Sequence, residues 1–320
     1  MATILAVFLT ATAFFALLHS TANAENADST QKDAASGRNR VPNLQRRRLP
    51  EGVKVERDIV YARVGEKELP LDLYLPENAT KPLPVVVWVH GGGWRNGSKG
   101  SGGPALPMVS RGFAVVDVEY RFSGEAIFPA QIQDCKAAIR WIRANAKEYG
   151  LDPDQIGAWG SSAGGHLVAL MGTAGDVKQF DTSENGEYSS RIQAVCDWFG
   201  PTDLLRMDDF PGTMNHNAPN SPESQLIGGP IQDNKEQVAR ANPITYIGED
   251  DPPFLIVHGE KDQTVPCNQS ELLYDALIKN GVEATLYRVK DGDHGFRGAT
   301  EDTHSELVEM AAKFFGKHLK

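Results

Sequence analysis

Short apolar runs recur along this chain and alternate with segments of helical periodicity. A run that is apolar at nearly every position is typical of a strand covered on both faces. Such runs occupy residues 85–90, 113–120 and 156–160, and further strands are predicted at 194–199, 254–258 and 284–290. Between the second and third runs, Ile132, Cys135, Ile139 and Ile142 recur at helical spacing. The alternation predicts a mostly parallel central sheet with helices on both faces.

Two strands before this pattern and two helices toward its end complete the expected domain. Residues 53–64 and 69–74 alternate between apolar and polar, as half-buried strands do, so we expect an antiparallel pair at one edge of the sheet. Further helices are predicted at 268–279 and 305–319. The segment 201–246 is rich in Pro, Gly, Asn and Asp and is too long for a plain connection. We therefore expect one α/β domain over residues 51–320, with an insertion at about 201–246 near the site.

The N-terminal segment has the composition of a leader followed by a tether. The first 24 residues contain no Asp, Glu, Lys or Arg, are apolar from Ile4 to Leu18 and end in Ala22-Asn23-Ala24. This pattern predicts a signal peptide cleaved near Ala24 and a secreted or periplasmic protein. The alternative is an uncleaved anchor, although the apolar run is short for a membrane span. Residues 25–50 have almost no apolar side chains and are expected to form a flexible linker.

The net charge argues against nucleic acid and anionic membranes as partners, and the cysteine spacing argues against a metal site. The 320-residue chain has a formal net charge of −10, which opposes binding to nucleic acid or to an anionic membrane surface. Cys135, Cys196 and Cys267 allow one disulfide at most, and their spacing is not that of metal ligands. We expect buried thiols, no metal site and no redox chemistry.

The pentapeptide from Gly160 to Gly164 matches the pattern G-x-S-x-G. It follows a predicted strand and precedes an apolar helix over residues 166–171, which is the context in which the pattern carries meaning. In so sharp a turn, glycines two residues to either side of Ser162 avoid side-chain clashes. The serine hydroxyl then lies at the apex of the turn, beside a helix N-terminus that favours negative charge. Ser162 is the candidate nucleophile.

A serine nucleophile needs a base to accept its proton and a carboxylate to orient that base. Asp262 follows the predicted strand at 254–258, and His294 follows the strand at 284–290. Both should lie at the carboxyl edge of the sheet, where Ser162 also projects, and they follow the serine in the order Ser, Asp, His. The competing acids are Asp251, Asp291 and Asp293. The other seven histidines compete for the role of base. His19 lies in the leader, His304 and His318 in the last helix, His166 in the helix after the serine turn, and His90 and His258 at strand ends as hydrogen-bonding partners; His216 lies in the insertion and is a pocket candidate.

The last requirement of such a site is a pair of donors for an oxyanion. His90-Gly91-Gly92-Gly93-Trp94 follows the strand at 85–90, and its glycines allow backbone N–H groups to approach a substrate oxygen. With the N–H of Ala163, those of Gly92 and Gly93 are the expected oxyanion hole.

These motifs resemble those of the α/β-hydrolase superfamily. The His-Gly-Gly-Gly loop together with Gly-Ser-Ser-Ala-Gly-Gly is similar to the hormone-sensitive-lipase-like esterase branch. Closer still is the bacterial bifunctional feruloyl and acetyl esterase (BD-FAE) type of carbohydrate esterase. The stretches that carry this closer resemblance are 120–122, 128–130, 197–203, 222–230 and 241–244. The resemblance extends from about Val53 to the C-terminus.

The resemblance implies an α/β-hydrolase fold in which Ser162 is the nucleophile, Asp262 the orienting acid and His294 the base. It also implies deacylation of plant-polysaccharide esters, such as acetylated xylan or feruloylated arabinoxylan, without a metal or organic cofactor. Candidate substrate-pocket residues, for which ordinary packing or surface roles are the alternative, are Trp94, Arg95, His216 and Phe296.

Two other functions remain open from the sequence. The first is amide hydrolysis, because the His-Gly-Gly-x-Trp loop also occurs in kynurenine-formamidase-like hydrolases and a related serine turn occurs in prolyl-oligopeptidase-type peptidases. The export signal opposes the former, and the absence of a long propeller-like segment opposes the latter. The second is a catalytically silent binding module on a hydrolase scaffold. It is disfavoured because candidates for nucleophile, acid, base and oxyanion donors are all present.

Overall fold

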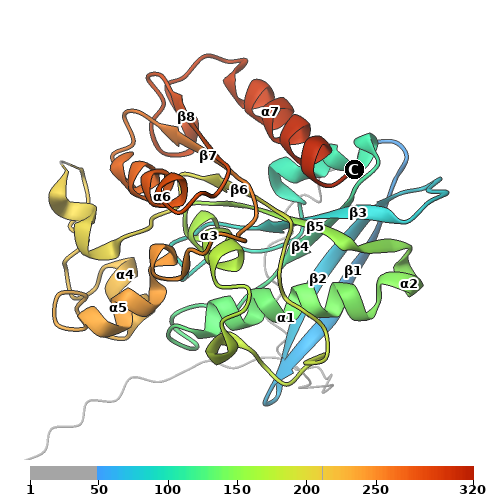
Figure 1. Cartoon of the computed structure of the whole chain (residues 1–320), viewed down its shortest axis with the longest axis horizontal. Coiled ribbons are helices and arrows are strands. Elements are labelled where there is room, and N and C mark those ends of the chain that lie inside the picture. Colours follow the sequence, from blue (N-terminus) through green and yellow to red (C-terminus); the bar gives the residue numbers. More distant parts are fainter. Residues whose placement is uncertain (1–48, 211) are drawn as a thin grey trace, which may run out of the picture. The chain divides into compact units, whose positions relative to one another are not determined.

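An eight-stranded sheet lies at the centre of the computed structural model, which describes residues 49–210 and 212–320 (Figure 1). Its strands are β1 (Val53–Val64), β2 (Lys67–Pro76), β3 (Leu83–Val89), β4 (Ala114–Val118), β5 (Leu151–Ser161), β6 (Ala194–Trp198), β7 (Phe254–Gly259) and β8 (Ala284–Val289). Their order across the sheet is β1-β2-β4-β3-β5-β6-β7-β8. β2 pairs antiparallel with both β1 and β4, and all the other pairs are parallel. The predicted mostly parallel sheet with an antiparallel edge pair is therefore present.

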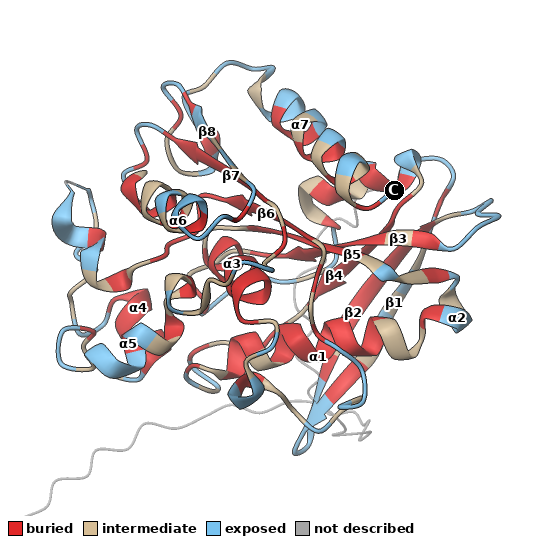
Figure 2. Ribbon diagram, in the orientation of Figure 1, coloured by how far each residue is buried: buried red, intermediate tan, exposed pale blue. Residues whose placement is uncertain are grey.

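Side chains alternate across the central strands and build an apolar layer on each face of the sheet. Val85, Val87 and Val89 of β3 join the core cluster that also contains residues of α1 (Ala130–Ala144), α3 (Ala163–Thr173) and α6 (Asn268–Lys279). Val86 and Trp88 join the second cluster, with α7 (Thr303–His318) and the 3-10 helix η1 (Gly103–Arg111). Figure 2 shows the buried residues concentrated along the strands and on the helix surfaces that face them. Helices thus cover both faces, as the alternating pattern predicted.

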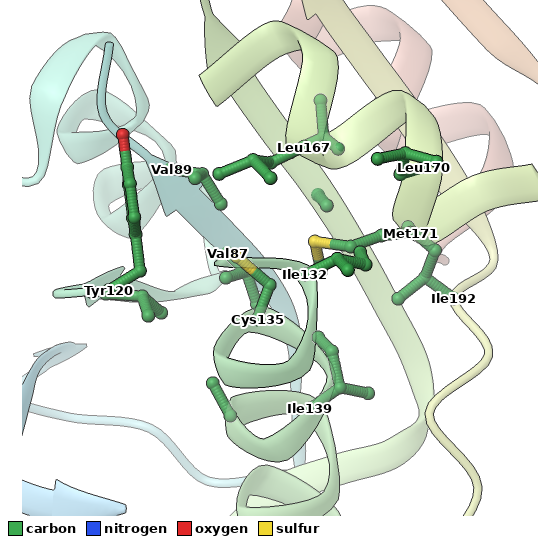
Figure 3. Packing of buried hydrophobic residues seen from close by; sticks show 14 of the residues in the cluster. Val87, Val89, Tyr120, Ile132, Cys135, Ile139, Leu167, Leu170, Met171 and Ile192 are labelled. Carbon is green, nitrogen blue, oxygen red and sulfur yellow. The ribbon is translucent and has the colours of Figure 1, made fainter. Parts of the chain in front are cut away.

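The helical periodicity that the sequence displays around residue 135 corresponds to the inner face of α1. Ile132, Cys135 and Ile139 are buried there, and Figure 3 shows them packed beside Val87 of β3 and near Leu167 and Met171 of α3. The order of strand, helix, strand and helix brings α1 and α3 onto the same side of the sheet.

The segment 201–246 runs between β6 and β7 and contains several short helices. They are η3 (Leu204–Asp209), α4 (Pro222–Ile227), α5 (Lys235–Ala241) and η4 (Pro243–Tyr246). The side chain of Ser221 caps α4 by accepting a hydrogen bond from the Ser224 N–H. Helices of four to seven residues are too short to show a helical period in the sequence. The remaining short helices are α2 (Ala146–Tyr149), η2 (Lys178–Phe180) and η5 (His294–Phe296).

The predicted signal peptide at 1–24 and nearly all of the predicted linker at 25–50 lie outside the described residues. Among the residues that are described, no helix combines the length and the apolar character needed to cross a bilayer. The same residues contain no group of three or more His, Cys, Asp or Glu side chains arranged to hold a metal ion. Cys135, Cys196 and Cys267 are free thiols, and the first two are buried.

Candidate active site

The loops that follow four parallel strands carry the candidate residues. Gly92 and Gly93 follow β3, and Ser162 follows β5. Asp262 follows β7, and His294 lies in η5 after β8. Because the carboxyl ends of parallel strands meet at one edge of a sheet, residues more than 200 positions apart are brought to one place.

Ser162 lies at the turn between β5 and α3. Its backbone has φ 54° and ψ −123°, a conformation that costs a non-glycine residue roughly 1–3 kcal/mol. The turn is held from both sides. The Ser162 N–H donates to the Trp198 carbonyl on β6 at 2.9 Å, and the Ser162 carbonyl accepts from the His166 N–H at 3.0 Å.

Close backbone packing explains the two glycines of the serine motif. A Cβ on Gly160 would lie 2.2 Å from the carbonyl oxygen of Gly164, inside the turn itself. A Cβ on Gly164 would lie 2.1 Å from the carbonyl oxygen of Val89, at the end of β3. Any larger residue at either position would force apart backbone segments that position Ser162.

The structure brings Ser162, His294 and Asp262 together in a hydrogen-bonded chain. The Ser162 Oγ lies 3.1 Å from His294 Nε2. On the other side of the imidazole, His294 Nδ1 lies 2.7 Å from Asp262 Oδ2. In this arrangement Nδ1–H donates to the carboxylate and Nε2 is free to accept the serine proton.

The Asp262 carboxylate is buried, and hydrogen-bond donors lie at both of its oxygens. Its Oδ1 accepts the backbone N–H groups of Thr264 and Val265, both at 2.8 Å. His258 Nε2, which donates to the Val265 carbonyl at 2.8 Å, lies 3.4 Å from Oδ2. Burial raises the pKa of Asp262, but the hydrogen bonds and charges of His258 and His294 outweigh it, so this pKa lies well below its usual value. Asp262 is therefore ionised throughout the neutral range.

The glycine-rich loop after β3 is held in place through His90. The Tyr120 hydroxyl donates to the His90 carbonyl at 3.0 Å, and the two rings stack with centroids 4.5 Å apart. His90 Nδ1 lies 2.7 Å from the Gly91 carbonyl. Gly92 and Gly93 then line the same cavity as Ala163, the first residue of α3. The first N–H groups of a helix have no intrahelical acceptor, so Ala163 can donate to a ligand in the cavity.

The cavity above Ser162 has a volume of about 400 Å³, within the range of roughly 300–1,000 Å³ that small-molecule sites occupy. Of the predicted pocket residues, Trp94, Arg95 and His216 line it. The lining residues that were not among those predicted are Gly91, Asn96, Ser161, Phe199, Pro201, Met214, Pro222, Glu223, Thr264 and Val265. Several of them come from the insertion between β6 and β7.

Phe296, a predicted pocket residue, is not among the residues that line this cavity. Its ring packs against Trp198 and Phe199, with centroids 5.1 and 4.9 Å apart. Phe296 follows His294 closely in sequence, but the turn of η5 directs it into the core while Phe199 faces the cavity. Proximity to His294 in the sequence does not report the direction of a side chain.

The rival acids have other partners. Asp291 forms an ion pair with Lys261 at 2.6 Å, and Asp293 accepts the Gln263 N–H at 3.0 Å. Asp251 accepts the Gly248 N–H at 2.9 Å. Within the described residues, Asp262 is the carboxylate that accepts from the His294 ring.

Comparison with known proteins places these features among esterases. The BD-FAE family model matches residues 71–277. Esterase LipQ of Mycobacterium tuberculosis is 32% identical over 265 residues, which are 81% of this chain and 61% of LipQ. The chain therefore spans less than two thirds of that relative's length.

Solved structures with a similar fold are also described as ester hydrolases. A structure described as a truncated form of a carbohydrate esterase from gut microbiota is 32% identical, with a TM-score of 0.74 over 84% of this chain and 99% of that one. An acetyl ester-xyloside bifunctional hydrolase from Caldicellulosiruptor lactoaceticus is 26% identical, with a TM-score of 0.68 over 84% of this chain and 97% of that one.

Proposed function

The chain belongs to the BD-FAE family of α/β-hydrolase esterases, and from this membership we propose that it hydrolyses carboxylic esters through an acyl-enzyme at Ser162. The observation that carries the proposal is the hydrogen-bonded chain from Ser162 through His294 to Asp262. A serine is a weak nucleophile at neutral pH and needs such a base.

In the first half of the reaction, Ser162 Oγ attacks the ester carbonyl carbon while His294 Nε2 takes its proton. Asp262 stabilises the imidazolium and keeps Nδ1 protonated. The N–H groups of Gly92, Gly93 and Ala163 stabilise the oxyanion. The loss of one such donor typically costs roughly 3 kcal/mol of transition-state stabilisation. The tetrahedral intermediate collapses when the bond to the alcohol breaks, and His294 returns its proton to the leaving oxygen.

In the second half, water replaces the alcohol. His294 Nε2 removes a proton from the water, whose oxygen attacks the acyl carbon. Collapse of the second tetrahedral intermediate breaks the bond to Ser162 Oγ, which regains the proton. The products are the free acid and the unmodified enzyme, so the cycle balances without a metal or an organic cofactor.

The proposed substrates are acetyl or feruloyl esters of plant polysaccharides such as xylan. This part of the proposal is supported by the related structures described as a carbohydrate esterase and as an acetyl ester-xyloside bifunctional hydrolase. We further propose export, with cleavage near Ala24 and the segment 25–50 as a tether. The leader composition supports this, and N-terminal sequencing of the protein recovered outside the cytoplasm tests it.

A substrate panel tests the proposed activity. We expect turnover of p-nitrophenyl acetate, release of acetate from acetylated xylan or of ferulate from feruloylated arabinoxylan, and no turnover of formyl-kynurenine or peptides. The variant Ser162→Ala should fold and show no turnover, and a fluorophosphonate probe should label Ser162 of the wild-type protein. Preference for formyl-kynurenine or peptides would replace the proposal with amide hydrolysis. Failure of both labelling and turnover in folded protein would indicate a silent binding module.

A further inference from the structure

A second polar pair lies in the cavity and takes no part in the reaction as proposed. His216 Nδ1 lies 3.1 Å from Glu223 Oε1, and their side chains are 3% and 5% exposed. Both residues line the cavity with Ser162 and His294. A buried ion pair in a substrate cavity calls for an explanation, because removing two charged groups from water costs several kcal/mol per ion.

The far oxygen of this pair has no partner. Glu223 Oε2 is buried and makes no hydrogen bond to any described residue, whereas the Thr264 backbone is a further partner of the His216 ring. Buried polar atoms in native proteins are nearly always hydrogen-bonded, and an unpaired one costs about 1–3 kcal/mol. Glu223, which lines the cavity, therefore carries an unused acceptor.

The backbone around the pair is fixed by other contacts. Asp208 accepts the N–H groups of His216 and Asn217 at 3.1 and 2.9 Å. Glu223 lies in the first turn of α4, directly after Pro222 and behind the Ser221 cap. These contacts position both side chains before any substrate binds.

The pair also borders the glycine-rich loop after β3, whose Gly92 and Gly93 are proposed to bind the oxyanion. A Cβ on Gly93 would lie 3.3 Å from the Pro222 Cβ, so the first turn of α4 packs against this loop. An unpaired carboxylate there would oppose the oxyanion through like-charge repulsion. Burial lowers the pKa of His216, but Glu223, Asp208 and the Thr264 backbone more than offset this and raise it. When His216 is protonated, its charge offsets that of Glu223.

We propose that His216 and Glu223 form a hydroxyl-binding subsite that selects esters of sugars over esters of alcohols without further hydroxyls. Glu223 Oε2 accepts the O–H of a hydroxyl on the ring that carries the ester. His216 is a positioning residue that holds the carboxylate through Oε1. A sugar presents O–H donors on carbons next to the ester, which matches an acceptor without a partner.

This inference rests on the proposed function and adds the alcohol that the site prefers. A purely aliphatic or aryl alcohol would leave Glu223 Oε2 buried and unpaired in the complex. Sites built to hydrogen-bond a hydroxyl reject analogues that lack it for this reason.

The test compares two acetates that have similar rings and the same acyl group. We measure kcat/KM for a mono-acetylated methyl xyloside and for cyclohexyl acetate, and take their ratio. We expect this ratio to fall by about tenfold or more in both His216→Gln and Glu223→Gln. The control variant Glu236→Gln, on the exposed side of α5, should keep the wild-type ratio. The active-site concentration cancels in the ratio, and His216→Asn is a second variant should His216→Gln fold poorly.

Each outcome has a defined meaning. A ratio that stays within about threefold of wild type in both variants overturns the subsite. A wild-type enzyme that hydrolyses cyclohexyl acetate but no xyloside acetate overturns it as well, while the esterase proposal stands. A wild-type protein that hydrolyses neither ester and is not labelled at Ser162 overturns the proposed function together with this inference.

Discussion

Trp94 donates its indole N–H to Nδ1 of His166 across 3.2 Å. This hydrogen bond joins the glycine-rich loop after β3 to the helix that begins just after Ser162. His166 Nε2 in turn lies 2.7 Å from the Ala241 carbonyl at the end of α5. One buried imidazole thus connects the loop after β3, the helix α3 and the insertion.

Replacing His166 should change how stability depends on pH. Burial lowers the pKa of His166 to about 4, so between pH 6.5 and about 4 the unfolded chain takes up a proton that the folded chain does not. The stability contributed by neutral His166 is complete above pH 6.5 and is lost as the pH falls toward 4. The variant His166→Met lacks this group and also leaves the Trp94 N–H and the Ala241 carbonyl unpaired. We expect it to be about 2–4 kcal/mol less stable at pH 7.5.

Urea denaturation of both proteins at several pH values measures this effect. The difference between their free energies of unfolding should narrow by up to about 3 kcal/mol between pH 6.5 and pH 4. Other titrating groups contribute equally to both proteins and cancel. A difference that stays constant over this range contradicts the prediction.

Replacing Asp262 by Asn should remove most of the activity and leave the loop intact. The Asn Oδ1 can still accept the Thr264 and Val265 N–H groups that Asp262 binds. Its amide nitrogen, however, would donate to His294 Nδ1 and move the imidazole proton to Nε2, which then cannot accept from Ser162. We expect kcat for p-nitrophenyl acetate to fall by about 10³–10⁴-fold.

The matched control for this change is Asp291→Asn, since Asp291 is paired with Lys261 outside the cavity. Its kcat should stay within about twofold of wild type. An Asp262→Asn enzyme that keeps more than a tenth of the wild-type kcat would rule out the orienting role of Asp262.

Two glycine-to-alanine changes should have opposite effects on stability. A Cβ at Gly164 would meet the Val89 and His90 carbonyl oxygens at 2.1 and 2.6 Å, so Gly164→Ala should destabilise the fold by more than about 3 kcal/mol. Gly316 lies within α7 and has nothing within 4 Å of the same position. Gly316→Ala should stabilise the protein by up to about 1 kcal/mol. Thermal denaturation of the two variants measures both, and a neutral Gly164→Ala would show that the turn relaxes.

Shortening Phe296 should affect stability and leave substrate preference unchanged. Phe296→Leu removes ring contacts with Trp198 and Phe199, which should cost about 1–2 kcal/mol and lower Tm by several degrees. The relative kcat/KM for acetyl and butyryl esters should stay within about threefold of wild type. A tenfold change in this preference at an unchanged Tm would restore Phe296 to the pocket.

The fold class and the family were predictable from sequence, and the comparisons confirm both. The reason is physical: strands buried on both faces must be apolar throughout, and a strand-to-helix turn as tight as that at Ser162 requires glycine at Gly160 and Gly164. The meeting of Ser162, Asp262 and His294 followed from the same reasoning, because parallel strands bring their carboxyl ends to one edge.

Contacts made by the insertion were not predictable. Glu223 gave no signal as a pocket residue, since its partner His216 lies seven positions away across a turn and a helix cap rather than on a shared helix face. The short helices α4 and α5 show no period that would reveal which side chains point inward. The packing of Phe296 was not predictable for a related reason, because the direction of a side chain in a single turn depends on the backbone angles there.

The insertion begins and ends in neighbouring strands. β6 and β7 pair in parallel from Val195 with Phe254 to Trp198 with Val257, so the sheet fixes both ends of the segment between them. Ser162 lies before this segment, and Asp262 and His294 lie after it. The fold therefore places the hydrogen-bonded chain on the sheet, while the insertion adds Met214, His216 and Glu223 to the cavity wall. A substitution in that wall changes the shape of the cavity at a distance in sequence from all three members of the chain.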